Sequence, residues 1–154
     1  MDPFSIRPAV INDLPEIISL LQNDKLGKNR QLDFHENEET YVQAFENIIQ
    51  DPYQHLMVLQ ETESQEVIGT LQLSFIQYLT YSGGLRAQIE AVRVNAEYRE
   101  KGLGKLLVHW AVRKARQEGA HLVQLTSDLQ RPEAIKFYEN LGFKHSHAGM
   151  KLHF

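Results

Sequence analysis

Residues 92–105 read Val92-Arg93-Val94-Asn95-Ala96-Glu97-Tyr98-Arg99-Glu100-Lys101-Gly102-Leu103-Gly104-Lys105, and they are the most informative segment of the chain. A predicted strand ends in it and a long predicted helix begins in it, with two glycines and three cations around the turn. The first amides of a helix have no intrahelical partner and carry partial positive charge. Glycine lets an anion approach that backbone closely. The pattern therefore predicts a phosphate-binding turn, to which Arg99, Lys101 and Lys105 add charged contacts.

Two familiar phosphate-binding motifs do not match this turn. A Walker loop requires G-x-x-x-x-G-K-[ST], whereas Gly104 and Lys105 are followed by Leu106. A dinucleotide-binding fingerprint requires G-x-G-x-x-G, and its third glycine position is Leu107. The residues alone leave a plainer alternative open, in which the glycines only turn the chain and the cations only keep the surface soluble.

Hydrophobic periodicity predicts strands and helices on both sides of the turn. The expected strands are Ser5–Val10, Leu56–Gln60, Val67–Tyr78, Ala87–Val94, His121–Ser127 and Phe143–Phe154, and the expected helices are Leu14–Leu21, Glu38–Ile49, Leu103–Glu118 and Pro132–Leu141. Leu56–Gln60 and Val67–Tyr78 form a predicted hairpin. The order β-α-α-β-β-β-α-β-α-β is typical of a layered α/β domain with a mixed sheet.

Local signals place the ends of the helices. Asp13 is expected to cap the first helix, with Glu16 reaching back to complete a capping box. Asp51-Pro52 ends the second helix. Gly119 and Gly142 are expected to end the last two helices.

Composition excludes several classes of protein. The 154 residues suit a single domain over residues 1–154. A net charge of −4 gives no basic surplus for bulk nucleic-acid binding. The chain has no cysteine, and therefore no disulfide framework, thiolate nucleophile or Cys-ligated metal site. We find neither an apolar run near the ~20 residues of a transmembrane helix nor a signal peptide, and expect a cytoplasmic protein without membrane partners.

The turn resembles the coenzyme A pyrophosphate loop of the GNAT superfamily of N-acetyltransferases. The pattern [Arg/Gln]-x-x-Gly-x-[Gly/Ala] is matched by Arg99, Gly102 and Gly104. The segment 134–143, with sequence AIKFYENLGF, resembles the A-x-x-F-Y-x-x-x-G-F element of that family, and Ile6-Arg7-Pro8-Ala9 resembles its common opening. The resemblance covers most of the chain and is weakest over residues 26–54.

The resemblance implies a three-layer fold, with helices on both faces of a mixed central sheet that is splayed at an acetyl-CoA cleft. Backbone groups of Val92, Arg93 and Val94 would pair with the pantetheine arm. The pyrophosphate would be held by the segment that consists of Arg99, Glu100, Lys101, Gly102, Leu103, Gly104 and Lys105. An amide near Val92 would polarise the thioester carbonyl. No metal is implied, and acetyl-CoA acts as a co-substrate.

Glu90 matches the glutamate that often acts as general base in this family, directly or through water. A base is needed because an alkyl ammonium near pKa ~10 holds its proton at neutral pH. Strict alternation would place Glu90 on one face with Val92 and Val94, partly enclosed. The alternative interpretation of Glu90 is a solvated or salt-bridged carboxylate on a strand.

Tyr138 matches the family's tyrosine, which would donate its phenolic proton to the departing thiolate or hydrogen-bond it. Its alternative interpretation is core packing, because aromatic residues on an amphipathic helix are usually buried. Arg131 departs from the pattern, since the family commonly has Asn three residues before the Ala134 position. It would contact a phosphate or the adenine of CoA, or only cover the cleft.

Other polar residues stay unassigned. His145 and His147 alternate on a predicted strand, where they could share a metal, although a plain surface strand fits them better. The polar segment Asp24–His35 is a candidate substrate-contacting loop. Phe75, Tyr78, Tyr81 and Arg86 lie near the hairpin that usually borders the acceptor pocket.

The resemblance implies an N-acetyltransferase that moves acetyl from acetyl-CoA to a primary amine of a small molecule by direct attack. Its C-terminal half is similar to aminoalkylphosphonate and amino-sugar-phosphate acetyltransferases. Alternatives are a protein N-terminal or lysine acetyltransferase and a non-catalytic CoA-binding sensor. The resemblance also suggests a homodimer, for which the apolar C-terminal strand is a candidate surface.

Overall fold

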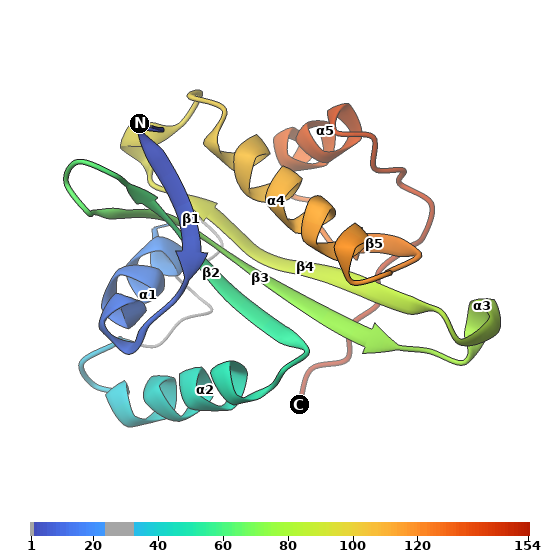
Figure 1. Ribbon diagram of the computed structural model, residues 1–154, viewed down its shortest axis with the longest axis horizontal. Helices are drawn as coiled ribbons and strands as arrows, with labels where there is room; N and C mark the ends of the chain where they lie inside the picture. The colour runs from blue at the N-terminus through green and yellow to red at the C-terminus, as the bar shows by residue number, and fades with distance from the viewer. Residues whose placement is uncertain (1, 24–32) are drawn as a thin grey trace. The chain divides into compact units, whose positions relative to one another are not determined.

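The computed structural model of the protein describes residues 2–23 and 33–154 (Figure 1). The chain forms two compact units, Met1–Gln124 and Leu125–Phe154, which are described in turn. The expectation of one domain stays a prediction.

Five strands form one sheet in the order β1-β2-β3-β4-β5. They are β1 (Phe4–Pro8), β2 (Gln54–Glu61), β3 (Val67–Gln77), β4 (Leu85–Val94) and β5 (Leu122–Leu125). The first four strands are antiparallel to their neighbours, so the predicted hairpin is confirmed. The His121 amide donates to the Leu85 carbonyl at 2.9 Å, and Gln124 reaches Gln88 three residues further along both segments. Strand β5 therefore runs parallel to β4, and the sheet is mixed.

Helices cover both faces of this sheet (Figure 1). Helices α1 (Leu14–Gln22) and α2 (Glu38–Gln50) lie against the face that carries Val58, where Leu14, Ile17, Ile18 and Phe45 join one apolar cluster. Helix α4 (Leu103–Gln117) lies against the opposite face and buries Leu107, Val108 and Ala111 completely. The apolar stripe at helical spacing causes this arrangement, because each helix hides one face from water. Ile49, the last residue of the predicted helix Glu38–Ile49, does not join this cluster and is 54% exposed.

The start of α1 differs from the predicted capping box. Asp13 ends a short 3-10 helix, η1 (Ile11–Asp13), and its side chain makes no cap to α1. It accepts instead from the Val10 amide at 2.8 Å and from the guanidinium of Arg7. The carboxylate forms an ion pair with a charged residue of β1 instead of capping α1. Local sequence spacing does not reveal this contact.

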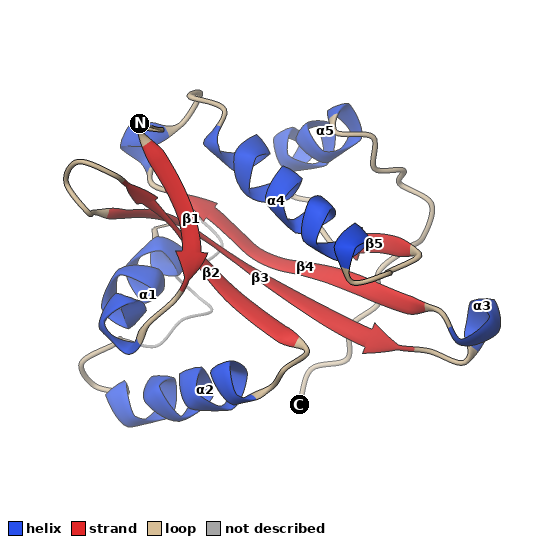
Figure 2. Cartoon of the chain, in the orientation of Figure 1, coloured by secondary structure: helices blue, strands red, loops and turns tan. Residues whose placement is uncertain are grey.

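The second unit contains helix α5 (Pro132–Asn140), as predicted, and Gly142 follows it with φ +92°. The predicted strand Phe143–Phe154 was wrong: in the described chain these residues form no strand, and Figure 2 draws them as loop. Met150, Leu152 and Phe154 are almost fully exposed. Alternating apolar residues favour an extended chain, but a strand also needs a partner for its backbone groups.

Candidate active site

Strand β4 carries a bulge in the centre of the predicted site. Gln72 pairs with Glu90 and Thr70 pairs with Arg93, so three steps along β4 face two along β3. Ala91 has φ +55°, a left-handed conformation that is rare outside glycine. Because paired residues share a face, Glu90 lies with Arg93 rather than with Val92 and Val94 as strict alternation predicted.

The second half of β4 has an edge that β5 does not cover. Strand β5 starts level with Leu85 and is four residues long, which is roughly 13 Å at about 3.3 Å per residue. Gln124 already lies beside Gln88, so β5 ends near residue 89 of a strand that continues to Val94. Strand β5 therefore ends before it reaches Val92. It does not pair with the backbone groups of Val92 to Val94 on that edge, as expected for a splayed sheet. The Arg93 guanidinium donates to the Val92 carbonyl at 2.8 Å.

The turn after β4 presents backbone amides at the start of α4. Asn95 accepts from the Glu97 amide at 3.1 Å and thereby caps η3 (Ala96–Tyr98). Gly102 then has φ +76°, and the first bond of α4 runs from the Leu106 amide to the Gly102 carbonyl at 3.0 Å. The amides of the preceding residues, 103–105, come before this ladder and have no intrahelical acceptor. Helix amides without an internal acceptor are able to bind an anion.

Charged side chains surround these amides. Arg99, Lys101 and Lys105 are exposed, and Glu100 is exposed with φ +64°. The Lys101 ammonium lies 4.5 Å from the centre of the Tyr98 ring, within cation–π range. This contact holds one cation of the turn on a neighbouring aromatic ring.

Tyr98 is a residue of this site that the sequence analysis missed. Its ring makes an edge-on contact with Phe4 of β1, with centroids 6.5 Å apart. Partial desolvation first, and then the carboxylates Glu61 and Glu66, raise the pKa of Tyr98. Tyr98 thus joins the turn to β1 and to the ends of β2 and β3. An aromatic residue just before Arg99 was the only available signal.

Glu90 is exposed and belongs to a row of amides. Gln88 donates to Glu90 Oε1 at 2.9 Å, and Gln124 donates to Gln88 Oε1 at 2.7 Å. Two further glutamines of the same sheet face, Gln72 and Gln54, are hydrogen-bonded at 2.7 Å. The sequence showed glutamines at these positions without indicating that four strands bring them into one row.

The remaining predicted residues, Tyr138 and Arg131, belong to the second unit. Tyr138 is half-buried and makes edge-on ring contacts with Phe137 at 5.0 Å and Phe143 at 5.8 Å. Arg131 precedes the first turn of α5, where its carbonyl accepts from the Ala134 amide at 3.1 Å. Tyr138 therefore has the packing contacts of its alternative interpretation, together with the sequence context of its functional one.

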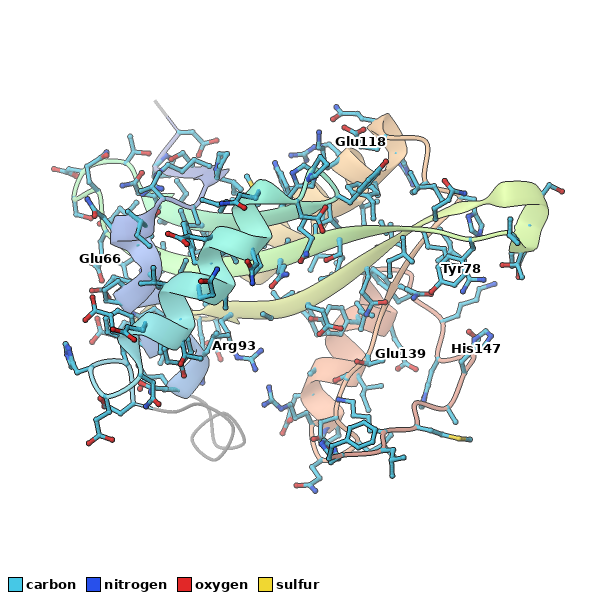
Figure 3. All side chains as sticks on the ribbon, turned by 90° about the horizontal axis from the view of Figure 1, so that it is seen from below. Glu66, Tyr78, Arg93, Glu118, Glu139 and His147 are labelled. Carbon is cyan, nitrogen blue, oxygen red and sulfur yellow. The ribbon has the colours of Figure 1, made fainter. Side chains whose placement is uncertain are left out.

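The residues around the β3–β4 connection form their own cluster. The Arg86 guanidinium lies 4.2 Å from the Tyr78 ring centre and 5.6 Å from that of Tyr81. Tyr81 belongs to α3 (Thr80–Gly83), where its φ is +53°. Figure 3 shows Tyr78 at the α3 end of the sheet and Arg93 toward the other end, so this cluster and the phosphate-binding turn lie at opposite ends of β4.

Two other candidates receive no support. Among residues 2–23 and 33–154, no group of three His, Asp or Glu side chains is arranged to hold a metal, and His147 bonds Ser146 instead. The candidate loop Asp24–His35 lies largely outside the described residues. Over the described part of the chain, no helix combines the length and apolar character needed to cross a bilayer.

Comparison with known proteins identifies the family. The family model described as "Acetyltransferase (GNAT) family" matches residues 15–143. The chain is 28% identical over 142 residues to an aminoalkylphosphonate N-acetyltransferase of Salmonella typhimurium, which covers 92% of this chain and 86% of the relative. It is 33% identical over 86 residues to a glucosamine 6-phosphate N-acetyltransferase of Trypanosoma brucei brucei, which covers 56% of each protein.

A crystal structure provides a further match. A protein of Bacillus halodurans C-125, named a transcriptional regulator, is 44% identical and superposes with a TM-score of 0.93, covering 98% of this chain and 99% of that one. The mixed five-stranded sheet with helices on both faces is the fold of GNAT acetyltransferases. The predicted family, fold class and enzyme class are therefore confirmed. This chain belongs to the GNAT family and is an acyltransferase that uses acetyl-CoA.

Proposed function

We propose that this enzyme acetylates a primary amine of a small molecule by direct attack on acetyl-CoA in a ternary complex. One observation carries the proposal: the uncovered edge of β4 leads, through Asn95 and η3, to the unpaired amides at the start of α4. An extended thioester arm that ends in a diphosphate needs these two features in this order.

The chain's own groups suit each part of acetyl-CoA. Backbone groups of Val92, Arg93 and Val94 pair with the pantetheine arm as an added strand would. The diphosphate is bound by segment Arg99–Lys105, where the amides of α4 and three cations favour negative charge. Arg131 contributes a further cation for a phosphate.

Glu90 and Tyr138 carry the proton transfers. Glu90 takes a proton from the ammonium, and the neutral nitrogen then attacks the thioester carbonyl carbon. The C–N bond forms as the carbonyl becomes an oxyanion, whose collapse breaks the C–S bond. Tyr138 gives its phenolic proton to the departing thiolate, and the second proton lost by the nitrogen restores the Tyr138 hydroxyl through solvent. An amide near Val92 stabilises the oxyanion between these steps. Gln88 occupies only Oε1 of Glu90, and Oε2 has no hydrogen bond within the described chain.

Two relatives suggest the chemistry of the acceptor. Their names specify an aminoalkylphosphonate and glucosamine 6-phosphate. Both compounds join a primary amine to a phosphorus oxyanion on a small skeleton. We therefore expect an acceptor of this class, rather than the amine of a protein N-terminus or lysine.

A thiol-release assay with acetyl-CoA tests the proposal. The amine panel contains 2-aminoethylphosphonate, glucosamine 6-phosphate, ethanolamine and a lysine-containing peptide. Turnover of the phosphorylated or phosphonylated amines is expected to exceed that of ethanolamine and the peptide. A preference for the peptide would favour a protein acetyltransferase. Calorimetric binding of CoA without turnover of any amine would indicate a non-catalytic sensor.

Substitution of the base gives a second test. Glu90→Gln keeps the shape of the side chain but cannot accept a proton. It should lower the rate about 10²–10⁴-fold, most strongly at low pH, where few amines are neutral. Acetyl-CoA affinity should be unchanged. An unaltered pH–rate profile would remove Glu90 from the mechanism.

A further inference from the structure

A second residue faces the place where Glu90 would meet the amine. Gln72 of β3 pairs with Glu90 of β4 across the antiparallel ladder. Directly opposed side chains lie on one face with Cβ atoms about 4.5–5.5 Å apart. Gln72 is half-buried, whereas Glu90 is exposed, so the pair lies where the covered part of the sheet face reaches solvent.

Hydrogen bonds fix which end of the Gln72 amide points toward Glu90. The Asp51 carboxylate accepts from Gln54 Nε2 at 3.1 Å and from the Tyr53 amide at 2.8 Å. A carboxylate only accepts, so the amide of Gln54 must present its nitrogen to Asp51 and its oxygen to Gln72. Gln72 Nε2 donates to that oxygen at 2.7 Å.

The two ends of this relay have different properties. The hydrogen bond from Gln54, and then that from the Tyr53 amide, lower the pKa of Asp51, which keeps the carboxylate ionised and the direction of the relay constant. At the other end the nitrogen of Gln72 is directed to β2. The Gln72 oxygen, Oε1, is therefore directed to the opposite side, toward β4, and has no hydrogen bond within the described chain.

A second chain of hydrogen bonds ends at Glu90, which also presents an acceptor oxygen. Gln124 donates to Gln88, which donates to Glu90, again with every donor directed at a carboxylate. Gln72 and Glu90 therefore present acceptor oxygens at neighbouring positions of one sheet face. Two acceptors repel one another unless a group with several N–H bonds lies between them, and a primary ammonium has three.

We propose that Gln72 is an amine-binding residue whose amide oxygen, oriented through Gln54 by Asp51, accepts a hydrogen bond from the acceptor nitrogen beside Glu90. This inference rests on the proposed function, because it needs an amine at Glu90. The nitrogen must offer one N–H to Gln72 and lose another proton to Glu90 before it attacks, and a primary ammonium, with three N–H bonds, meets both requirements. Gln54 and Asp51 act as positioning residues.

The test compares Gln72→Met with Gln72→Glu. Met has nearly the length of Gln but no acceptor oxygen, whereas Glu restores the acceptor. Initial rates are measured with each amine of the panel that the wild type acetylates, varying amine and acetyl-CoA separately. Gln72→Met should lower kcat/KM for the amine about 10–100-fold, the usual effect of losing a hydrogen bond to a charged group. The KM for acetyl-CoA should stay within about twofold.

Further variants separate binding from a structural role. Gln72→Glu should recover most of the lost kcat/KM, because its carboxylate again presents an acceptor oxygen to the amine. Gln54→Met should cause a smaller loss, about 3–10-fold, because Gln72 remains but is no longer oriented. Gln43→Met on α2, where Gln43 bonds only Asn47 in the described chain, is the matched control and should behave as wild type. Thermal unfolding of each variant is measured in parallel.

The outcomes distinguish this inference from the function on which it rests. Wild-type kinetics in Gln72→Met, together with a strong effect of Glu90→Gln, would overturn the role of Gln72 alone. A loss in Gln72→Met that Gln72→Glu does not recover, and that follows the thermal midpoint, would also overturn it. Absence of turnover by the wild type with every amine would overturn the proposed function itself.

Discussion

The guanidinium of Arg7 donates to both oxygens of the Asp13 carboxylate, at 2.7 and 2.9 Å. The Asp13 side chain is only 8% exposed, and its remaining contact is the Val10 amide. The pair joins β1 to the 3-10 turn that starts α1. Removing one partner of a bidentate pair at a nearly buried carboxylate costs more than removing one partner of an exposed pair.

Asp13→Asn should lower the free energy of unfolding by about 1–3 kcal/mol, because Arg7 then loses its charged partner while partly buried. Urea unfolding at neutral pH measures the change. Glu118→Gln is the control, since Glu118 pairs with Lys114 on an exposed part of α4 and should cost little. Equal effects of the two substitutions would contradict the assigned importance of the buried pair.

The same pair predicts a dependence on acid. Burial raises the pKa of Asp13, but the hydrogen bond from Arg7, the Val10 amide and the charge of Arg7 together lower it below its usual value. The stabilising effect is therefore complete above the unfolded pKa of about 3.9 and is lost as the pH falls through the lower folded value. When unfolding is measured between pH 6 and 2, the free energies of unfolding of wild type and Asp13→Asn should become more alike as the pH falls.

His55 should destabilise the fold in mild acid. Burial, and then the charge of Lys114, lower the pKa of His55, while Glu118 opposes them more weakly. The unfolded chain therefore binds a proton more readily, and stability falls as the pH drops below about 6.5. In His55→Gln the slope of unfolding free energy between pH 7 and 5 should be shallower. Parallel slopes would show that His55 does not titrate with folding.

The bulge at Ala91 should tolerate glycine and reject valine. A left-handed φ of +55° costs an L-residue roughly 1–2 kcal/mol, and a β-branched side chain more. Ala91→Gly should fold with nearly unchanged stability, since relieved strain offsets the added freedom of the unfolded chain. Ala91→Val should lose stability and CoA affinity together, which thermal unfolding and calorimetry would detect. Normal CoA binding by a folded Ala91→Val would separate the bulge from the site.

Two glycines provide a matched pair for the phosphate-binding turn. Gly102 and Gly83 both have positive φ, at +76° and +79°, and an added Cβ would meet nothing within 4 Å at either position. Alanine at each should cost about 1 kcal/mol from the backbone conformation alone. Only Gly102→Ala should also weaken CoA binding, about fivefold or more, because Gly83 lies at the β3–β4 connection. Equal CoA affinities would count against the turn as the diphosphate site.

Tyr138→Phe tests the proposed acid without removing its ring contacts. The edge-on contacts with Phe137 and Phe143 need only the ring, so the variant should fold normally. Its kcat should fall about 10²–10⁴-fold with little change in CoA affinity. Tyr53→Phe, whose side chain is 60% exposed, serves as the control. Wild-type kcat in Tyr138→Phe would leave the tyrosine with a packing role only.

Local features of the sequence predicted most elements and the glycine turn between β4 and α4. The stripe of α4, the glycines of the turn and the end of α5 at Gly142 depend on residues within one or two helical turns of each other, and these predictions were confirmed. The prediction that Glu90 shares a face with Val92 and Val94 was wrong. One extra residue at Ala91 shifts every later residue of β4 to the opposite face of the sheet. No residue pattern marks that bulge, since Ala is an unusual choice there.

Periodicity, turn residues and the motif from Arg99 to Gly104 are short-range properties, and from them the sequence predicted the family and the order of the main strands and helices through α5, although not the short α3. The tertiary structure was needed to show that Gln72 opposes Glu90, that Arg7 pairs with the carboxylate of Asp13, and that residues 143–154 form no strand. These features depend on which distant segment lies alongside. That choice is made by the register of backbone hydrogen bonds and the burial of one sheet face, which a linear pattern does not encode.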